Sequence, residues 1–260
     1  MLKKLFRKRS IEQQPIIGVP EGQCVYAIGD VHGRLDLLDD LLERIHDDFA
    51  GRRADRQRII FLGDLIDRGP DSAAVVDRAI ELSRSDKQVE ILMGNHEEVF
   101  LGALDGSTRM MNLFCKIGGK NTILSYGITL EEYNAGDYGD LIALCQARVP
   151  AAHIDFMRRF ETKPIIVGDY VFVHAGVRPS VALGDQRESD MRWIRDEFLD
   201  SDVAHEKIVV HGHSITAEVD ERDNRIGIDT GAFSSGKLTA LVLAGTERRF
   251  LSTAGETMDA

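Results

Sequence analysis

The segment Gly29-Asp30-Val31-His32-Gly33 follows a short apolar run at residues 24–28, and it decides the fold class of this chain. The run contains β-branched and aromatic residues, which predicts a buried β-strand. The flanking glycines let the backbone turn sharply off the strand and leave room for a ligand. Asp30 and His32 can then face one ion once the loop curls. The chain therefore begins its folded part with a strand that ends in two candidate metal ligands.

Predicted strands alternate with predicted helices through the N-terminal part of the chain. Apolar runs predict strands at residues 24–28, 59–62 and 89–93, and helical spacing of apolar residues predicts helices at residues 38–49, 75–80 and 97–104. This β-α-β-α-β order predicts parallel strands joined by right-handed crossovers. The fold class is therefore α/β.

Strand signals resume in the C-terminal part. Strands are predicted at residues 165–167, 170–173, 207–210, 225–228 and 237–243, the last two as antiparallel sheet, and a helix is predicted at residues 191–199. Gly168-Asp169 suits a two-residue hairpin turn between the first two of these strands.

Residues 105–160 interrupt the alternation with a mostly helical pattern, broken at Gly118-Gly119, Gly127, Gly136 and Pro150. A helical insertion between two sheet-forming halves could serve as a lid or a wall of a substrate cleft, or equally as packing scaffold. The expected organisation is a basic tail and linker at residues 1–22, one domain at residues 23–245 that carries this insertion, and a strand or tail at residues 246–260.

Polar side chains follow five of the predicted strands. They are Asp30 and His32, then Asp64 and Asp67 with Arg68, then Asn95 and His96, then His174, and finally His211 and His213. In open α/β sheets, ligands bind outside the carboxyl ends of the strands. This mixture of oxygen and nitrogen donors suits a binuclear site for divalent metals.

The alternative for each segment alone is a structural role. A lone Asp-x-His is commonplace, and a single histidine at a strand end is more often a hydrogen-bonded structural group. It is improbable that all five segments would occur by chance in this order, each at a strand end. Clustered Asp30, Asp64 and Asp67 would also raise one another's pKa values, and bound cations remove that difficulty.

Composition narrows the class of protein further. A chain of 260 residues can form one large α/β domain, and a net charge of −11 argues against general binding to nucleic acid. Cys24, Cys115 and Cys145 lack CxxC spacing, so free thiols in a reducing, cytoplasmic compartment are expected. The basic residues 1–9 could be a short anchor for anionic lipid or a solvated tail, and they lack the apolar region of a secretory signal.

These segments resemble the metallophosphoesterase superfamily, and most closely its phosphoprotein phosphatases, the lambda phosphatase-like bacterial Ser/Thr protein phosphatases. That family carries GDxHG, GDxVDRG and GNHE in this order, followed by two separate metal-binding histidines. This chain has G-D-V-H-G, then G-D-L-I-D-R-G at residues 63–69, G-N-H-E at residues 94–97, His174, and Gly212-His213-Ser214. The segments at residues 193–196 and 228–232 are also similar to bacterial members, and the resemblance covers residues 24–243. Ile66 and Ser214 are conservative departures from the usual Val and Thr.

The resemblance implies a four-layer αββα sandwich of two mixed sheets flanked by helices, the calcineurin-like metallophosphoesterase fold. It implies that Asp30 and His32 hold a first ion, that Asp64 bridges both ions, and that Asn95, His174 and His213 complete the second site. His96 would be the general acid, oriented by Asp67, and the substrate phosphate would contact Arg68, Asn95 and Arg195. Two divalent ions are implied, with manganese expected and iron, zinc, nickel or magnesium as alternatives. His211 remains an alternative to His213 as a ligand.

The implied reaction is hydrolysis of a phosphomonoester by in-line attack of a hydroxide that bridges the two ions. The first expectation for the substrate is a phosphoprotein, as for a Ser/Thr protein phosphatase that acts as a monomer. The alternative is a small phosphorylated molecule, such as a dinucleoside polyphosphate, a nucleotide or a short polyphosphate. Symmetrical dinucleoside tetraphosphatases look less similar, because they commonly lack the second aspartate that Asp67 supplies. A non-enzymatic binding protein is disfavoured, because every expected catalytic position is filled.

Overall fold

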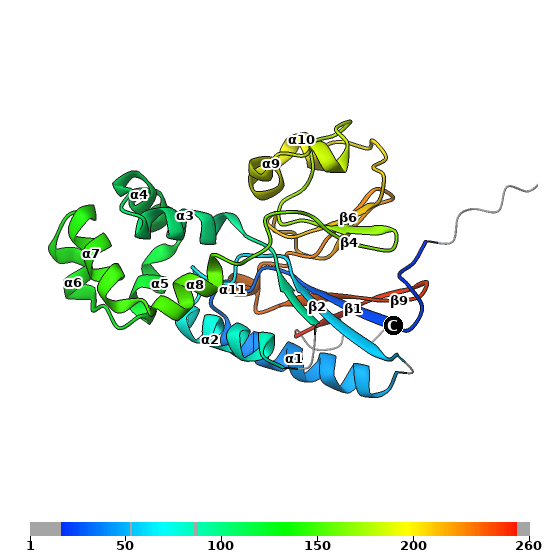
Figure 1. Ribbon diagram of the computed structural model, residues 1–260, viewed down its shortest axis with the longest axis horizontal. Coiled ribbons are helices and arrows are strands. Elements are labelled where there is room, and N and C mark those ends of the chain that lie inside the picture. The colour runs from blue at the N-terminus through cyan, green and yellow to red at the C-terminus, as the bar shows by residue number, and fades with distance from the viewer. Residues whose placement is uncertain (1–16, 53, 86–87, 254–260) are drawn as a thin grey trace, which may run out of the picture.

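Two five-stranded sheets face each other in this chain (Figure 1), as described by a computed structural model of residues 17–52, 54–85 and 88–253. The first sheet has the order β10-β9-β1-β2-β3, and its strands are β1 (Gln23–Ile28), β2 (Arg56–Phe61), β3 (Gln88–Ile91), β9 (Thr239–Ala244) and β10 (Glu247–Ser252). The second sheet has the order β4-β5-β6-β8-β7, and its strands are β4 (Ile165–Val167), β5 (Tyr170–Phe172), β6 (Ile208–His211), β7 (Asp220–Glu221) and β8 (Arg225–Gly227). The basic segment at residues 1–9, with its predicted lipid contact, lies outside the described residues.

Both sheets are mixed, as predicted. In the first sheet β1, β2 and β3 run parallel, whereas β9 pairs antiparallel with β1 and with β10. In the second sheet β5, β6 and β8 run parallel, and β4 and β7 pair antiparallel at the two edges. The predicted hairpin turn at Gly168-Asp169 joins β4 to β5, and Gly168 takes the positive φ of 57° that this turn needs.

The alternation of side chains along the strands builds three apolar layers. Tyr26 and Ile28 of β1 pack toward α1 (Leu35–Ala50) and α2 (Ser72–Ser83), whereas Val25 and Ala27 pack between the sheets. In β5, Phe172 faces the space between the sheets, and Val171 instead packs with Phe198 under the outer helices. The period of two along each strand therefore confirms the αββα sandwich.

The insertion at residues 105–160 is helical, as predicted. After α3 (Asn95–Leu104) come α4 (Thr108–Ile117), α5 (Gly119–Ser125), α6 (Leu130–Ala135), α7 (Tyr138–Arg148) and α8 (Ala151–Met157). These helices project beyond the ends of the sheets in Figure 1. Their apolar side chains nevertheless continue the core that covers the first sheet, because Met111, Phe114 and Cys145 belong to the same cluster as Tyr26.

Two predicted elements differ from the structure. The single helix predicted at residues 191–199 is two short helices, α9 (Glu188–Trp193) and α10 (Asp196–Leu199). The break occurs because Ile194 is extended, with ψ of 143°, and its side chain is buried in the third layer. The strands predicted at residues 225–228 and 237–243 were expected as antiparallel sheet, but β8 and β9 lie in different sheets. Between them the chain crosses from one sheet to the other through α11 (Ala232–Ser235).

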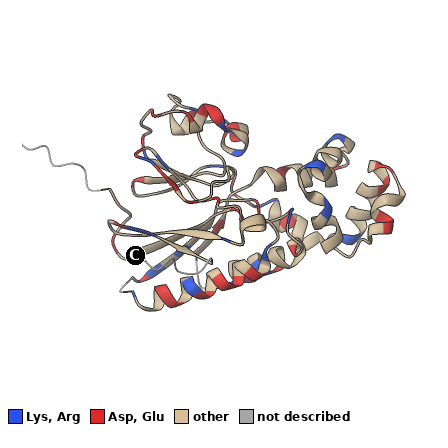
Figure 2. Ribbon diagram, turned by 180° about the vertical axis from the view of Figure 1, so that it is seen from behind, with Lys and Arg blue, Asp and Glu red and all other residues tan. Residues whose placement is uncertain are grey.

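Many charged side chains lie on the outside of these layers. The solvent side of α1 exposes Asp36, Asp39, Glu43 and Asp47, which form the acidic row along this helix in Figure 2. The three cysteines form no disulfide; Cys24 and Cys145 are buried and Cys115 is half-buried. Within the described ranges, no helix combines the length and the apolar character that crossing a membrane requires.

Candidate active site

The predicted site residues converge where the strand ends of the two sheets meet. Asp64 lies just after β2 in the first sheet, whereas His174 and His213 lie just after β5 and β6 in the second. Two groups of side chains have ligand atoms within 4.8 Å of one another: His32, Asp64 and His96 in one, and Asp64, His174 and His213 in the other. Asp64 belongs to both groups, which is the position that a bridging ligand requires.

Asp64 is surrounded by imidazole nitrogens. Its Oδ2 lies 3.4 Å from Nε2 of His174, 3.7 Å from Nε2 of His32 and 3.8 Å from Nε2 of His96. Its Oδ1 accepts a hydrogen bond of 3.0 Å from the backbone N–H of His96. All four side chains are at most 2% exposed, so the cluster is buried.

The tautomers of two histidines point lone pairs into the cluster. Nδ1 of His174 donates to the carbonyl oxygen of Leu62 at 2.8 Å, and Nδ1 of His32 donates to that of Ile66 at 2.8 Å. A neutral imidazole that donates from Nδ1 has a lone pair at Nε2. In His174 this lone pair faces Oδ1 of Asn95 at 2.9 Å, so two acceptors converge on one place. Converging acceptors are what a cation requires.

The histidines are held in the neutral form that binds metals. Burial lowers the pKa of His32 to about 3, and burial also lowers the pKa values of His174 and His213. Nε2 of His213 is buried without a hydrogen-bond partner among the described residues. A neutral imidazole with an unused nitrogen is the ligand form of histidine.

His211 lies apart from this cluster. Its Nδ1 is 3.0 Å from the carbonyl oxygen of Gly212, and its ring packs edge-on against Phe198 at 5.1 Å, under the outer helices. The ring of His213 instead lies 5.0 Å from that of His174. The geometry therefore favours His213 over His211 as the ligand.

Asp30 has a second carboxylate beside it that sequence reasoning did not assign. The two carboxylate oxygens of Asp30 accept the backbone N–H of His213 at 3.0 and 3.2 Å. Burial, Asp229 and Asp64 raise the pKa of Asp30, and burial raises the pKa of Asp229 to about 6. Oδ2 of Asp229 is buried and unpaired among the described residues. Asp229 follows β8, so the strand-end rule could have identified it. Three crowded carboxylates fit bound cations.

His96 and Asp67 form a buried pair. Nδ1 of His96 lies 2.6 Å from Oδ2 of Asp67, and the two side chains are 2% and 0% exposed. Burial lowers the pKa of His96, but the charge of Asp64 and the hydrogen bond to Asp67 outweigh it, so the pKa is raised. A raised pKa favours the protonated imidazole, which is the form that a general acid needs.

Two arginines border the cluster. Nη2 of Arg68 lies 3.3 Å from Nε2 of His96, and its guanidinium stacks over the ring of Phe233 at 4.7 Å. Phe233 on α11 was not predicted as a site residue. Arg195 is exposed at the break between α9 and α10, and its charge contributes to lowering the pKa of His213. A guanidinium group is well suited to binding phosphate.

The backbone of the site is strained. Six described residues other than glycine have positive φ, and five of them are predicted site residues: His32, Asp64, Asp67, Arg68 and His213. Such conformations cost about 1–3 kcal/mol each and persist only where surrounding contacts hold them. These backbone conformations therefore reduce local stability, and they direct the five side chains toward the site.

Glu97 is the main contact that holds this strained turn, and sequence reasoning gave it no role. It is fully buried, and its carboxylate accepts the backbone N–H groups of Asp64, Leu65 and Ile66 at 3.0, 2.7 and 3.3 Å. It also accepts that of Gly94 at 3.2 Å, which caps α3. The observed α3 begins two residues before the helix predicted at residues 97–104, so Glu97 is its third residue, the position from which a glutamate caps a helix.

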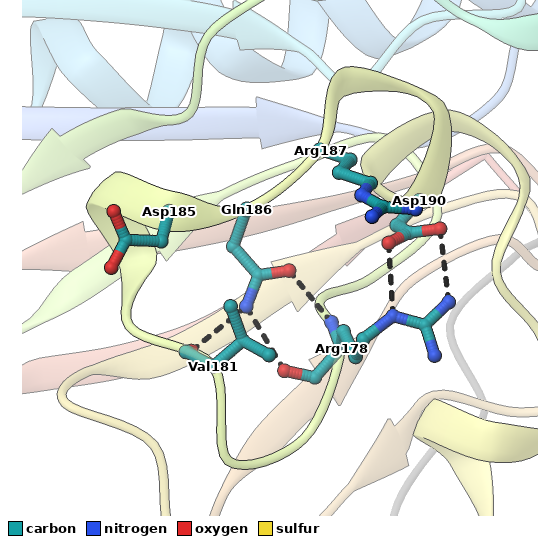
Figure 3. Close-up of a pocket in the computed structure, with 6 residues that line it drawn as sticks. All are labelled: Arg178, Val181, Asp185, Gln186, Arg187 and Asp190. Carbon is teal, nitrogen blue, oxygen red and sulfur yellow. Dashed lines mark hydrogen bonds and ion pairs between the residues drawn. The ribbon is translucent and has the colours of Figure 1, made fainter.

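A cavity of about 470 Å³ lies elsewhere, beside the loop between β5 and α9. Figure 3 shows that Gln186 cross-links this loop: it accepts the backbone N–H of Arg178 at 2.8 Å and donates to the carbonyl oxygens of Arg178 and Val181 at 2.9 Å each. Arg178 is bound to Asp190 at 3.0 Å. None of the predicted site residues lines this cavity, so we assign the loop a structural role.

Comparison with known proteins places this geometry in context. The model of the calcineurin-like phosphoesterase family matches residues 25–233. An asymmetrical bis(5'-nucleosyl)-tetraphosphatase, PrpE of Anoxybacillus flavithermus, is 26% identical over 242 residues, which cover 82% of this chain and 88% of that protein. The PrpE of Oceanobacillus iheyensis is 25% identical over 249 residues, covering 87% of this chain and 90% of that protein.

Solved structures share the fold. A chain assigned as a diadenosine tetraphosphatase aligns with a TM-score of 0.60 at 20% identity, covering 88% of this chain and 93% of that one. A cold-active protein-tyrosine phosphatase of a Shewanella species aligns with a TM-score of 0.51 at 18% identity, covering 92% and 85%. At these identities the likeness concerns the fold alone.

Replacement of Glu97 tests its role in holding the turn. Because glutamine has one acceptor oxygen where glutamate has two, Glu97→Gln should leave about two N–H groups unpaired. The free energy of unfolding should fall by about 2–4 kcal/mol, measured by urea denaturation. Glu98→Gln is the matched control, since Glu98 lies on the same helical turn but is partly exposed and bonds Arg192 and Trp193. Equal losses in the two variants would contradict the role of Glu97.

Replacement of Asp64 tests the shared position. Asp64→Asn removes the charge that both histidine groups share, so the number of divalent ions bound per chain should fall, as measured by elemental analysis after dialysis against manganese. His211→Asn provides the comparison, because it removes a buried imidazole that lies outside the cluster. Full metal occupancy in Asp64→Asn would rule out a bridging position.

Proposed function

This chain belongs to the calcineurin-like phosphoesterase family, and we propose on that premise that it is a metal-dependent hydrolase that cleaves dinucleoside tetraphosphates asymmetrically. The observation that carries the proposal is the match to asymmetrical bis(5'-nucleosyl)-tetraphosphatases, which spans most of both chains. These relatives support the small-molecule alternative better than the phosphoprotein substrate that the motifs suggested first. The matched region, residues 25–233, contains every predicted ligand and His96.

The donor set supports a site for two divalent ions. Asp30, His32 and Asp64 would hold one ion, and Asp64, Asn95, His174 and His213 would hold the other. Their neutral imidazoles, their crowded carboxylates and the unpaired nitrogen of His213 fit such ions. We propose manganese as the metal. When bound, the ions would lower the pKa of a water molecule and offset the charge of the phosphate.

The protein's own side chains have separate tasks in this proposal. Arg68 and Arg195 bind oxygens of the phosphate under attack and hold it in line with the incoming water. Protonated His96 donates to the oxygen of the departing group, and Asp67 accepts a hydrogen bond from its Nδ1 and so holds the ring in place. The guanidinium of Arg68 contacts Nε2 of His96, so the phosphate and the acid are brought to one place.

The surroundings of Arg195 suit an extended nucleotide. Trp193 precedes it by two residues and is 38% exposed, although its indole N–H is bound to Glu98 at 2.6 Å. An aromatic ring held in one orientation with an open face can stack on a nucleobase. A cation and a partly exposed aromatic ring therefore lie two residues apart, and together they suit a nucleotide with several phosphates.

The products of diadenosine tetraphosphate test the proposal. Incubation with manganese should yield ATP and AMP in equal amounts, separated by ion-exchange chromatography, because an asymmetrical cut leaves three phosphates on one nucleoside. Magnesium, zinc and nickel are tested in parallel. Formation of two ADP molecules would contradict the asymmetrical cut. Faster hydrolysis of a phosphoserine peptide than of the tetraphosphate would instead identify a protein phosphatase.

Replacement of His96 tests the acid. His96→Asn should lower kcat by about 10²–10⁴-fold on an alkyl phosphate while leaving metal content unchanged. The loss should be smaller on p-nitrophenyl phosphate and on the tetraphosphate, because their leaving groups are weaker bases. His153→Asn is the matched control, since His153 is also buried and bound to a carboxylate, Asp77, at 2.9 Å, but lies on α8. A loss that is the same for every leaving group would exclude His96 as the acid.

A further inference from the structure

Asp67 and Arg68 are consecutive residues with left-handed backbone conformations. Their φ values are 76° and 66°, and neither residue is glycine. Two such conformations in succession are costly, so contacts from outside the turn must hold them. The side chains that these two residues present are the partner of His96 and a phosphate-binding arginine. Whatever holds this turn therefore also sets the geometry of the acid.

The turn is held from the helical insertion, by the start of α5. The backbone N–H of Arg68 donates to the carbonyl oxygen of Gly118 at 3.1 Å, and the side chain of Asn121 donates to the carbonyl oxygen of Arg68 at 2.5 Å. Gly118 itself must lack a side chain, because a Cβ there would lie 2.8 Å from Cγ of Arg68. The backbone N–H and the backbone carbonyl group of Arg68 are thus both bonded to one short segment, residues 118–121.

Thr122 on the same helix binds Asp67. Its hydroxyl donates to Oδ1 of Asp67 at 2.6 Å and accepts the backbone N–H of Asp67 at 2.9 Å. It also contacts the hydroxyl of Ser72 at 2.9 Å. Thr122 and Asp67 are 0% exposed, so this contact is shielded from solvent.

The carboxylate of Asp67 is consequently bonded at both oxygens. Thr122 occupies Oδ1, and Nδ1 of His96 lies 2.6 Å from Oδ2. A carboxylate bonded at one end only could rotate, whereas bonds at both ends fix its plane. The orientation of the His96 ring then follows from the position of Thr122.

We propose that Thr122 is a positioning residue for the catalytic acid, and that the insertion at residues 105–160 serves as the fixed support of the Asp67–His96 pair. Thr122 touches neither the predicted metal ligands nor a phosphate, and it acts through Asp67. The proposal rests on the role proposed for His96, and it does not depend on which phosphate compound is the natural substrate.

Leaving-group dependence separates this role from a merely structural one. In Thr122→Val, which keeps the shape of the side chain, kcat on glycerol 2-phosphate should fall by about 10–100-fold, a part of the whole acid contribution. The loss on p-nitrophenyl phosphate should stay below about 3-fold, since that leaving group needs little protonation. KM and metal content should not change. Thr122→Ser keeps the hydroxyl and should restore the activity, and Thr122→Ala repeats the test if the valine variant fails to fold.

Ser125→Ala is the matched control. Ser125 also lies on α5, but its hydroxyl bonds only the carbonyl oxygen of Thr122 and the backbone N–H of Ala73 among the hydrogen bonds described. This variant should leave the ratio of the two kcat values unchanged. In a His96→Asn background, Thr122→Val should cause no further loss on glycerol 2-phosphate. Equal losses on both substrates, a further loss in that background, or unchanged activity on glycerol 2-phosphate would each overturn the proposal.

A spectroscopic measurement needs no activity. The short bond between His96 and Asp67 should give a downfield proton signal in the NMR spectrum, which Thr122→Val should remove and Ser125→Ala should keep. Persistence of this signal in Thr122→Val would overturn the proposal. If the wild-type protein cleaves the monoesters but not diadenosine tetraphosphate, the proposed substrate is wrong and the test of Thr122 stands.

Discussion

The structure of this protein depends on the burial of charged groups at the place where its two sheets meet. Asp64 lies after a strand of the first sheet, and three imidazole nitrogens surround it within 3.4–3.8 Å. Two of the histidines on the site, His174 and His213, come from the second sheet. The sheets must therefore face each other with their strand ends level, and the apolar layer between them sets that alignment. Burial of Asp30, Asp64 and Asp229 together fits bound cations, which would offset the mutual repulsion of the three carboxylates.

The side chains of this site are positioned by strained backbone conformations and not by their own length. Left-handed conformations at His32, Asp64 and Asp67 point short side chains inward from the turns that follow the strands. The cost is offset by two fully buried groups, Glu97 and Thr122, which accept the backbone N–H groups of the strained turn. Each comes from a helix, so the helices contribute to the chemistry although they supply few of the groups that would touch a substrate.

The groups proposed to carry out hydrolysis are separate from the surfaces that would select the substrate. The proposed metal ligands and the His96–Asp67 pair suit hydrolysis of phosphate compounds in general, and they carry no information about the rest of the substrate. Specificity must come from the surfaces beside them, which include Arg195, Trp193 and Phe233. These residues lie on short elements, α9 and α11 with the break that follows α9, whose length is free to vary without disturbing the sheets. The similarity to tetraphosphatases is therefore a better guide to the substrate than the shared fold is.

The sequence by itself determined the parallel direction of the first three strands, the helical insertion and the strand-end position of the predicted ligands, because these depend on local periodicity and on glycines beside polar residues. It did not determine which sheet β8 and β9 join, because antiparallel pairing leaves no local signal of its partner. It also could not find the contacts of Glu97 with residues 64–66 or of Thr122 with Asp67, since these residues are 31–33 and 55 positions apart. Only the tertiary structure places His211 and His213 in different surroundings, because the ring of His211 packs against Phe198 whereas that of His213 lies beside that of His174. Local sequence specifies which groups can bind and react, but their partners in space are specified by packing.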